Sequence, residues 1–344
     1  MKLTFKIMML AVCMLSPCCM FASGKAIDYN VPCESWPAAQ QYLYAHVPEL
    51  RARVASDGAM GINQAWEAHK IDHWRIEEAR TADALMSGGI TQHNGDYIEA
   101  ALRAFDWGFA HQAADGSFAG TNDAFHSTSF FIEAAARSLY CLSVSPYAKA
   151  YAKELDRDRA NIHSAALWFT NDEMWNAGVV GNEPYGHRRF LVPAALCFAA
   201  LYTGDMSLLD KARPLLEKGL SLQAAEGYNP EKGGYDTNYN SLGLLLAMRW
   251  AMNLPDDPIT PRVNQMIERG MQWEASKILP TGEISSEGNT RTGVGLEKTL
   301  DGKPKIMQKT STLRAFVVYD CWHATTKYDS IVRKIHTFYS ERNM

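Results

Sequence analysis

Apolar residues recur at helical spacing along almost the whole chain, whereas runs that alternate apolar and polar residues, as strands do, are scarce. The pattern predicts an all-α protein. The expected helices span residues 35–55, 60–70, 74–87, 95–114, 124–143, 147–170, 187–203, 206–225, 237–254, 259–277, 307–325 and 327–341. Short connections with Gly or Asp-Gly stop signals separate them.

Three of the expected helices share one design: they open with polar and aromatic residues and then become apolar on every side. They begin near Phe125, His187 and Tyr239, roughly 50–60 residues apart. Because a helix that is apolar all round is buried, these helices should form an inner layer inside a ring of amphipathic outer helices. Repetition of this kind predicts an α/α toroid of six or seven helical hairpins, complete or incomplete.

The first residues of the chain are typical of a secretory signal peptide: Lys2 and Lys6 precede an apolar run and then small residues. The run is shorter than the roughly 20 residues that a membrane-spanning helix needs, so we expect no membrane span. We predict a signal peptide at residues 1–24 and export to the periplasm or the medium. Cys18 and Cys19 leave a lipid anchor open as an alternative, which the residues before them do not favour.

No linker-like stretch divides the remaining residues, so we expect 25–344 to form a single toroidal domain that acts as a monomer. Four cysteines follow the signal, too few for the disulfide framework of a small secreted protein. Cys141, Cys197 and Cys321 lie inside apolar helical runs and are expected to be buried hydrophobic residues, with their disulfide pairing left open. No CxxC or HExxH spacing occurs, so we expect neither a metal nor another cofactor.

The chain is weakly acidic, with a formal net charge of −4 that becomes about −6 without Lys2 and Lys6. The surface as a whole therefore does not attract polyanions, and without a basic helix or a phosphate-binding loop we expect no nucleic-acid partner. Between Gly288 and Arg314, however, six basic residues accompany two acidic ones. The basic residues are Arg291, Lys298, Lys303, Lys305, Lys309 and Arg314. This excess suits a local site for an anionic ligand, or it belongs to a solvated loop.

The loops that lead into the inner helices are rich in Gly, Asn, Tyr, His and Arg, a composition typical of a wet cleft. Their sequences are DGSFAGTNDAFH, GNEPYGH, NPEKGGYDTNY and PTGEISSEGNTRTG. Several tryptophans could stack on sugar rings, or could simply pack between helices. They are Trp66, Trp74, Trp107, Trp168 and Trp175.

The turns HQAADGSF, KGGYD and PTGEI resemble those of α/α-toroid carbohydrate enzymes. Together, the segments GNEPYGHRRF, YDTNYNSLG and EGNTRTG are similar to toroidal polysaccharide lyases that act on uronate polymers such as alginate and glucuronan. The resemblance covers most of the chain after the signal at the level of architecture. It implies that residues 25–344 are a catalytic domain and that the partner is an acidic polysaccharide or oligosaccharide. The Asn-Asn-His signature of one alginate lyase family is absent, which argues against membership of that family.

β-Elimination from a 4-linked uronate needs a group that neutralises the carboxylate, a base for the C5 proton and an acid for the leaving O4. In a syn reaction the base and the acid act on one face of the sugar, so one Tyr, or a His and a Tyr, can serve both steps. His187 and Tyr239 begin successive inner helices and could meet at one rim. The resemblance implies Tyr239 as the acid, or as both acid and base, and His187 as the base or its partner.

The remaining site residues are expected on the same rim. Asn182 and Asn238 are placed to bind the carboxylate, with Glu183 if it is protonated, and Arg291 could neutralise it together with Arg188 and Arg189. The expected substrate-binding residues are His126, Asn122, Arg188, Tyr235, Glu183 and Lys309. Each also has an ordinary structural reading as a helix cap or a surface residue.

Two other functions fit the same sequence. A glycoside hydrolase on this toroid, including the unsaturated-uronide type, would need two facing carboxyl groups. The candidates are Asp123, Glu183, Asp236 and either Glu67 or Asp72. A carbohydrate-binding protein without catalysis is the third reading.

Overall fold

The computed structural model describes residues 42–118, 120–121, 123–299 and 302–342. Within these ranges the regular elements are helices, and the chain pairs elsewhere only in isolated β-bridges. The all-α prediction is confirmed. The expected signal peptide and Asn122 lie outside the described residues.

The helices agree with the expected ones to within a few residues at most ends. They are α3 Val47–Ala52, α4 Ile62–Glu67, η2 Ile76–Thr81, α5 Ala82–Thr91, α6 Gly95–Ala110, α7 Ala124–Ser143, α8 Ala152–Thr170, α9 Asp172–Asn182, α10 Arg188–Thr203, α11 Leu208–Ser221, α12 Thr237–Asn253, α13 Thr260–Ser276, α14 Lys309–Trp322 and α15 Asp329–Ser340. Helix α9 was not expected, because its sequence mixes polar residues and glycines and lacks an apolar stripe.

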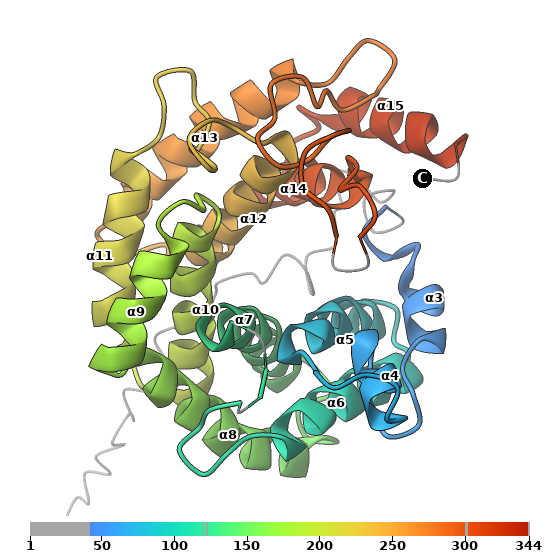
Figure 1. Ribbon diagram of the computed structural model, residues 1–344, viewed down its shortest axis with the longest axis vertical. Coiled ribbons are helices and arrows are strands. Elements are labelled where there is room, and N and C mark those ends of the chain that lie inside the picture. The colour runs from blue at the N-terminus through green and yellow to red at the C-terminus, as the bar shows by residue number, and fades with distance from the viewer. Residues whose placement is uncertain (1–41, 119, 122, 300–301, 343–344) are drawn as a thin grey trace, which may run out of the picture.

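The helices form two layers around a ring (Figure 1). The inner helices α5, α7, α10, α12 and α14 are almost entirely buried, and each packs on the next along this order. The outer helices α6, α8, α11, α13 and α15 expose one side to solvent. The toroid is thus confirmed, with five inner helices in the part of the chain that the structure describes. None of the described helices has the length and apolarity needed to cross a membrane.

A tight turn follows the outer helix α6 and locks it to the next outer helix. The backbone N–H of Ala113 donates to the carbonyl of Ser117 at 2.8 Å, and that of Gly116 donates to the carbonyl of Ala113 at 2.9 Å. Gly116 has φ of +89°, and a Cβ there would lie 2.2 Å from the carbonyl oxygen of Ser164 in α8. Only glycine therefore allows this close approach.

The same turn recurs around the ring. Glycines with positive φ after α3, α11 and α13 also touch a backbone carbonyl of the following outer helix. The pairs are Gly58 with Arg103, Gly227 with Arg269, and Gly282 with Lys334. After α8 the turn is absent and α9 stands in its place, with Asn182 at its end as its one buried residue.

A buried ionic network joins inner helices from opposite parts of the ring. Glu133 of α7 accepts hydrogen bonds from Arg137 at 2.8 Å and from Arg249 of α12 at 2.9 Å. Asp83 of α5 pairs with Arg137 and, at 3.4 Å, with Arg314 of α14. Burial raises the pKa of Asp83, but Arg314, Arg137 and Arg249 outweigh it and hold the pKa at about 2. The network thereby links the first and last inner helices.

The cysteines differ from one another. Cys141 and Cys197 are buried, as expected. Cys321 is also buried, as expected, and it is disulfide-bonded, which the sequence did not predict. The apolar pattern of α14 could not reveal this, because it reports burial and carries no information about a distant cysteine.

Glu133→Gln should lower the free energy of unfolding by about 3–5 kcal/mol, because Arg137 and Arg249 would stay buried with one carboxylate fewer to compensate them. Urea unfolding followed by circular dichroism measures this. Glu99→Gln is the matched control, since Glu99 pairs with Arg103 on the exposed surface and should change stability by less than about 1 kcal/mol. Equal effects of the two substitutions would contradict a stabilising role for the network.

Candidate active site

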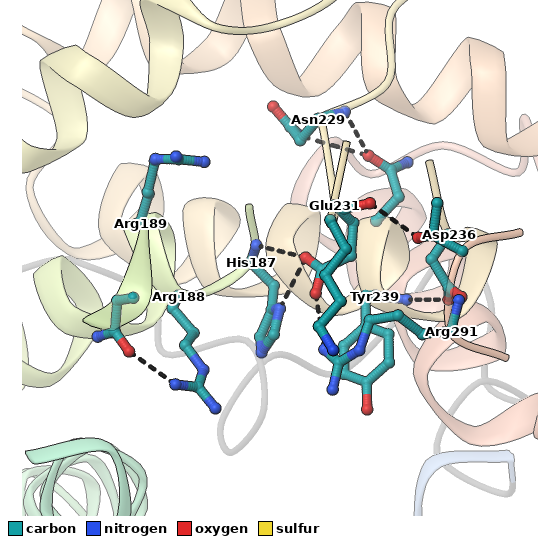
Figure 2. A network of polar contacts seen from close by, with 12 residues as sticks. His187, Arg188, Arg189, Asn229, Glu231, Asp236, Tyr239 and Arg291 are labelled. Atoms are coloured by element: carbon teal, nitrogen blue, oxygen red, sulfur yellow. Dashed lines mark hydrogen bonds and ion pairs between the residues drawn. The ribbon is translucent and has the colours of Figure 1, made fainter. Parts of the chain in front are cut away.

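The N-terminal ends of α10 and α12 bring His187 and Tyr239 together. His187 is the N-cap residue of α10, and Tyr239 lies in the first turn of α12. Their ring centroids are 4.7 Å apart, with 38° between the planes. Figure 2 shows the imidazole and the phenol directed to the same side of the site. Two groups that can transfer protons therefore stand side by side.

Glu231 lies behind this pair, and sequence reasoning did not find it. Its carboxylate is 1% exposed and accepts hydrogen bonds from Nδ1 of His187 at 3.0 Å and from Arg291 at 2.6 Å. Burial raises the pKa of Glu231, but His187 and Arg291 hold it at about 2. Burial is also the main cause that lowers the pKa of His187, against the opposing effect of Glu231. At neutral pH a neutral His187 thus donates Nδ1–H to an ionised Glu231, which leaves Nε2 with a free lone pair.

Arg291 lies over the face of Tyr239. Its guanidinium carbon is 3.8 Å from the centroid of the phenol ring. Its nitrogens donate to Glu231 at 2.6 Å and to Glu297 at 3.0 Å, so two carboxylates of the protein already compensate its charge. The expectation that Arg291 neutralises a substrate carboxylate does not fit this geometry; its position acts on Tyr239 instead.

Asn182, Arg188 and His126 form the other half of the site. Arg188 donates to the side-chain oxygen of Asn182 at 2.8 Å. Among the described residues, the amide nitrogen of Asn182, Nε of Arg188 and Nδ1 of His126 are buried and have no hydrogen-bond partner. Burial, Arg188 and His187 lower the pKa of His126, so its ring is neutral. Three buried groups that can donate hydrogen bonds are thus available to an anion.

Tyr235 points away from His187. Its hydroxyl donates to the backbone carbonyl of Glu287 at 2.9 Å and lies 3.2 Å from the ammonium of Lys277. Its ring packs against Trp273 of α13. The expectation that Tyr235 binds substrate beside His187 is therefore not met, because this hydroxyl is used to hold the loop.

Three further expected residues make no recorded contact with the pair. Glu183 is exposed and pairs with Lys218 at 3.0 Å. Lys309, at the start of α14, lies close enough to His336 to help burial lower the pKa of that histidine. Asn238 is half-buried in the first turn of α12, and its side chain makes no hydrogen bond to other described residues.

Several of the basic residues between 288 and 314 are compensated by carboxylates of the protein. Arg291 and Lys305 both bind Glu297, at 3.0 and 2.8 Å, and Arg314 belongs to the buried ionic network through Asp83. Charge counting along the sequence missed Glu231, which pairs with Arg291, and Asp83, which pairs with Arg314, because these carboxylates come from other parts of the fold.

Asp236 is a structural clamp. It is fully buried, and one oxygen caps α12 by accepting from the backbone N–H of Tyr239 at 3.2 Å. The other oxygen accepts from the backbone N–H groups of Arg291 at 3.0 Å and Thr292 at 2.6 Å. It fixes the loop of Arg291 against the helix of Tyr239, and its acceptor sites are occupied.

The other proposed hydrolase carboxyls also have separate structural partners. Asp123 is exposed and caps α7, Glu67 accepts the indole N–H of Trp107 at 3.1 Å, and Asp72 contacts the exposed His73 at 3.0 Å. No contact in the described part of the chain brings two of these carboxyl groups together. Nor does any group of three or more His, Cys, Asp or Glu side chains there form a metal site.

Most of the tryptophans pack inside the protein. Trp66, Trp74 and Trp107 surround His111 with ring centroids 4.2–5.3 Å from it. Trp74 and Trp107 are each only 5% exposed and cannot offer a face to a sugar. The alternative of packing between helices holds for these two residues.

A buried carboxyl group supports the loop of Glu231 from below. Glu274 of α13 accepts a hydrogen bond from the side-chain amide of Asn240 at 2.9 Å, and the oxygen of that amide accepts the backbone N–H of Asn229 at 3.0 Å. Burial raises the pKa of Glu274 to about 8, so the group is protonated at neutral pH. Loop, α12 and α13 are thus joined two residues from Glu231.

The raised pKa of Glu274 predicts that the free energy of unfolding falls as the pH rises. The folded protein keeps this proton up to about pH 8, whereas the unfolded chain releases it near 4.5. Its contribution is therefore complete below pH 4.5 and lost as the pH rises through 8, by up to about 1.4 kcal/mol per pH unit. Glu274→Gln should flatten this decline in urea unfolding between these limits, while the exposed Glu226→Gln should not. Identical slopes in both variants and the wild type would refute the assignment.

Comparison with known proteins shows one whose fold is similar. No family model matches the sequence, and no curated protein matches it. The fold is similar to that of the chondroitin AC lyase of Streptomyces coelicolor A3, whose X-ray structure holds chondroitin sulphate. The TM-score is 0.52 at 12% identity, over 92% of this chain and 48% of the lyase. This chain thus spans about half the length of that lyase, with which it shares a helical fold.

Proposed function

We propose that this protein is a polysaccharide lyase that cleaves a 4-linked uronate polymer by syn β-elimination. The observation that carries the proposal is the pair of His187 and Tyr239, 4.7 Å apart and directed to one side, with Glu231 and Arg291 behind them. The likeness to a chondroitin AC lyase supports the lyase class, since that protein has the same helical architecture.

In the proposed reaction Nε2 of His187 takes the C5 proton, and the hydroxyl of Tyr239 gives its proton to O4 as the C4–O4 bond breaks. The electron pair of the C5–H bond becomes the C4–C5 double bond. Glu231 stabilises the imidazolium that forms, and Arg291 over the phenol ring stabilises the developing phenolate. Water then returns the two groups to their starting protonation states.

The uronate carboxylate is proposed to bind at Asn182, Arg188 and His126. These residues carry the buried donor groups without partners within the described chain. Hydrogen bonds from a site with little water are strong, so they favour the enediolate that forms as the C5 proton leaves. In this assignment Arg188 replaces Arg291 as the arginine that faces the substrate carboxylate.

The order of the side chains supports this binding mode. Figure 2 shows Arg188, His187 and Tyr239 next to one another in this sequence. A uronate presents its carboxylate, C5 and O4 in the same sequence along one edge. With the carboxylate at Arg188, C5 would lie at His187 and O4 at Tyr239. Mannuronate and glucuronate have the syn relation that this one-sided arrangement requires, so alginate rich in mannuronate, or glucuronan, is the proposed substrate.

Export is part of the proposal, because an enzyme that degrades a polysaccharide of this kind encounters its substrate outside the cytoplasm. The disulfide at Cys321 supports it, since structural disulfides persist in oxidising compartments such as the periplasm. Glycoside hydrolysis is not proposed, because Asp236 serves as a clamp and no contact pairs the other candidate carboxyls.

Tyr239→Phe should abolish cleavage, by about 10²-fold or more, because O4 would leave without a proton donor. The assay mixes protein with alginate, glucuronan, pectate and chondroitin and follows the ultraviolet absorbance of the new C4–C5 double bond. Tyr235→Phe is the matched control and should keep most of the activity, since its hydroxyl is engaged with Glu287 and Lys277. New reducing ends without this absorbance would show a hydrolase and defeat the proposal.

Glu231→Gln should reduce kcat by about 10²–10⁴-fold, because the imidazolium formed in the transition state would lose its anion. Burial already lowers the pKa of His187, so the acid limb of kcat/KM should lie below pH 6.5 in the wild type. Loss of the anion lowers this pKa further, so the limb should move to lower pH in the variant. Rate measurements across the pH range test both points.

The matched control is Glu217→Gln, which removes a carboxylate that pairs with Arg262 on the outer surface. It should leave kcat and the acid limb unchanged. If Glu231→Gln behaved like this control, His187 would not be the base.

A further inference from the structure

We infer that Tyr185 is a positioning residue whose ring, facing Arg188, Arg291 and Lys232, holds Arg188 in place as the anion-binding group of the three. The inference rests on the proposed function in so far as the anion is the carboxylate of a uronate. Nothing in the sequence singled out Tyr185, which lies in the connection between α9 and α10.

The backbone fixes Tyr185 relative to both halves of the site. Its N–H donates to the carbonyl of Asn182 at 2.9 Å, and it forms an isolated β-bridge with Glu231. At the next residue, Gly186, a Cβ would lie 2.1 Å from the carbonyl oxygen of Pro230, so the two segments are in direct backbone contact. The ring is thus held between the carboxylate-binding side and the proton-transfer side.

Three cations gather around this half-buried ring. The guanidinium carbon of Arg188 is 4.0 Å from the ring centroid, that of Arg291 is 4.9 Å away, and the ammonium of Lys232 is 5.3 Å away. Like charges this close repel one another. The negative face of an aromatic ring attracts each of them, so the ring offsets part of this repulsion without introducing an anion.

The ring of Tyr185 carries no negative charge, and this matters most for Arg188. Arg291 and Lys232 both bind Glu297, at 3.0 and 2.5 Å, so their charges are compensated. Within the described residues, Arg188 has one carboxylate in ion-pair range, the exposed Asp123 at 3.5 Å. A carboxylate in place of the ring would bind Arg188 directly and compete with the substrate. Tyr185 orients this arginine without adding a second carboxylate that would compete with a ligand.

Two substitutions of Tyr185 distinguish the effect of its aromatic ring from the effect of its side-chain size. Tyr185→Leu removes the aromatic face, and Tyr185→Phe keeps it as the matched control. On the polymer that the wild type cleaves, Tyr185→Leu should raise KM about tenfold with a smaller change in kcat, and Tyr185→Phe should stay close to the wild type. A role in folding alone would instead lower the thermal midpoint of Tyr185→Leu and leave its KM unchanged.

A second measurement needs no turnover. The thermal midpoint of each protein is recorded against rising sodium sulfate, with sodium chloride at equal ionic strength as reference. The wild type and Tyr185→Phe should show an added stabilisation by sulfate, and Tyr185→Leu should need about tenfold more sulfate for the same shift. If Tyr185→Leu matches Tyr185→Phe, or sulfate has no added effect on the wild type, the inference is overturned. A negative lyase assay with the expected sulfate result would defeat the proposed function alone.

Discussion

Glu231 is the carboxylate on which the arrangement of the site depends. It binds His187 on one oxygen and Arg291 on the other, and each of these partners lies against the ring of Tyr239. A buried carboxylate is costly unless it is paired, and here both partners are themselves buried, so none of the three can move alone. The tautomer of His187, the position of Arg291 and the surroundings of the phenol are thus fixed by one group.

The toroid supplies the frame in which this group is held. Glycine turns lock outer helices to one another at every step except after α8, and the ionic network of Glu133 and Asp83 ties inner helices from opposite parts of the ring. The starts of α10 and α12 then come side by side because consecutive inner helices are neighbours. Where the repeated turn is replaced by α9, the ring gains Asn182 at its rim. The departure from the repeat is therefore what adds the side of the site that we propose binds the carboxylate.

The sequence predicted the features that depend on hydrophobic periodicity, such as the positions of the helices. It did not predict side-chain contacts whose partners come from distant segments. The helical period located α7 at the residues where the structure has it, and the shared design of the inner helices predicted that His187 and Tyr239 would meet. Glu231 and Tyr185 were missed, because an acidic or aromatic residue in a loop carries no sign of the side chains that it will contact. Lys309 was assigned to the site by charge alone, and the fold places it near His336.

The two arginines of the site, Arg291 and Arg188, differ in how far carboxylates of the protein compensate their charges. Arg291 donates to two protein carboxylates, so an incoming carboxylate beside it would meet Glu231 and Glu297 and be repelled. Arg188 keeps a buried nitrogen without a partner in the described chain, so the same carboxylate is attracted there. In the proposed reaction the substrate would therefore be directed with its charge toward Arg188 and its glycosidic oxygen toward the hydroxyl of Tyr239. Electrostatics alone would set the orientation that the elimination needs, before any contact with the sugar ring is considered.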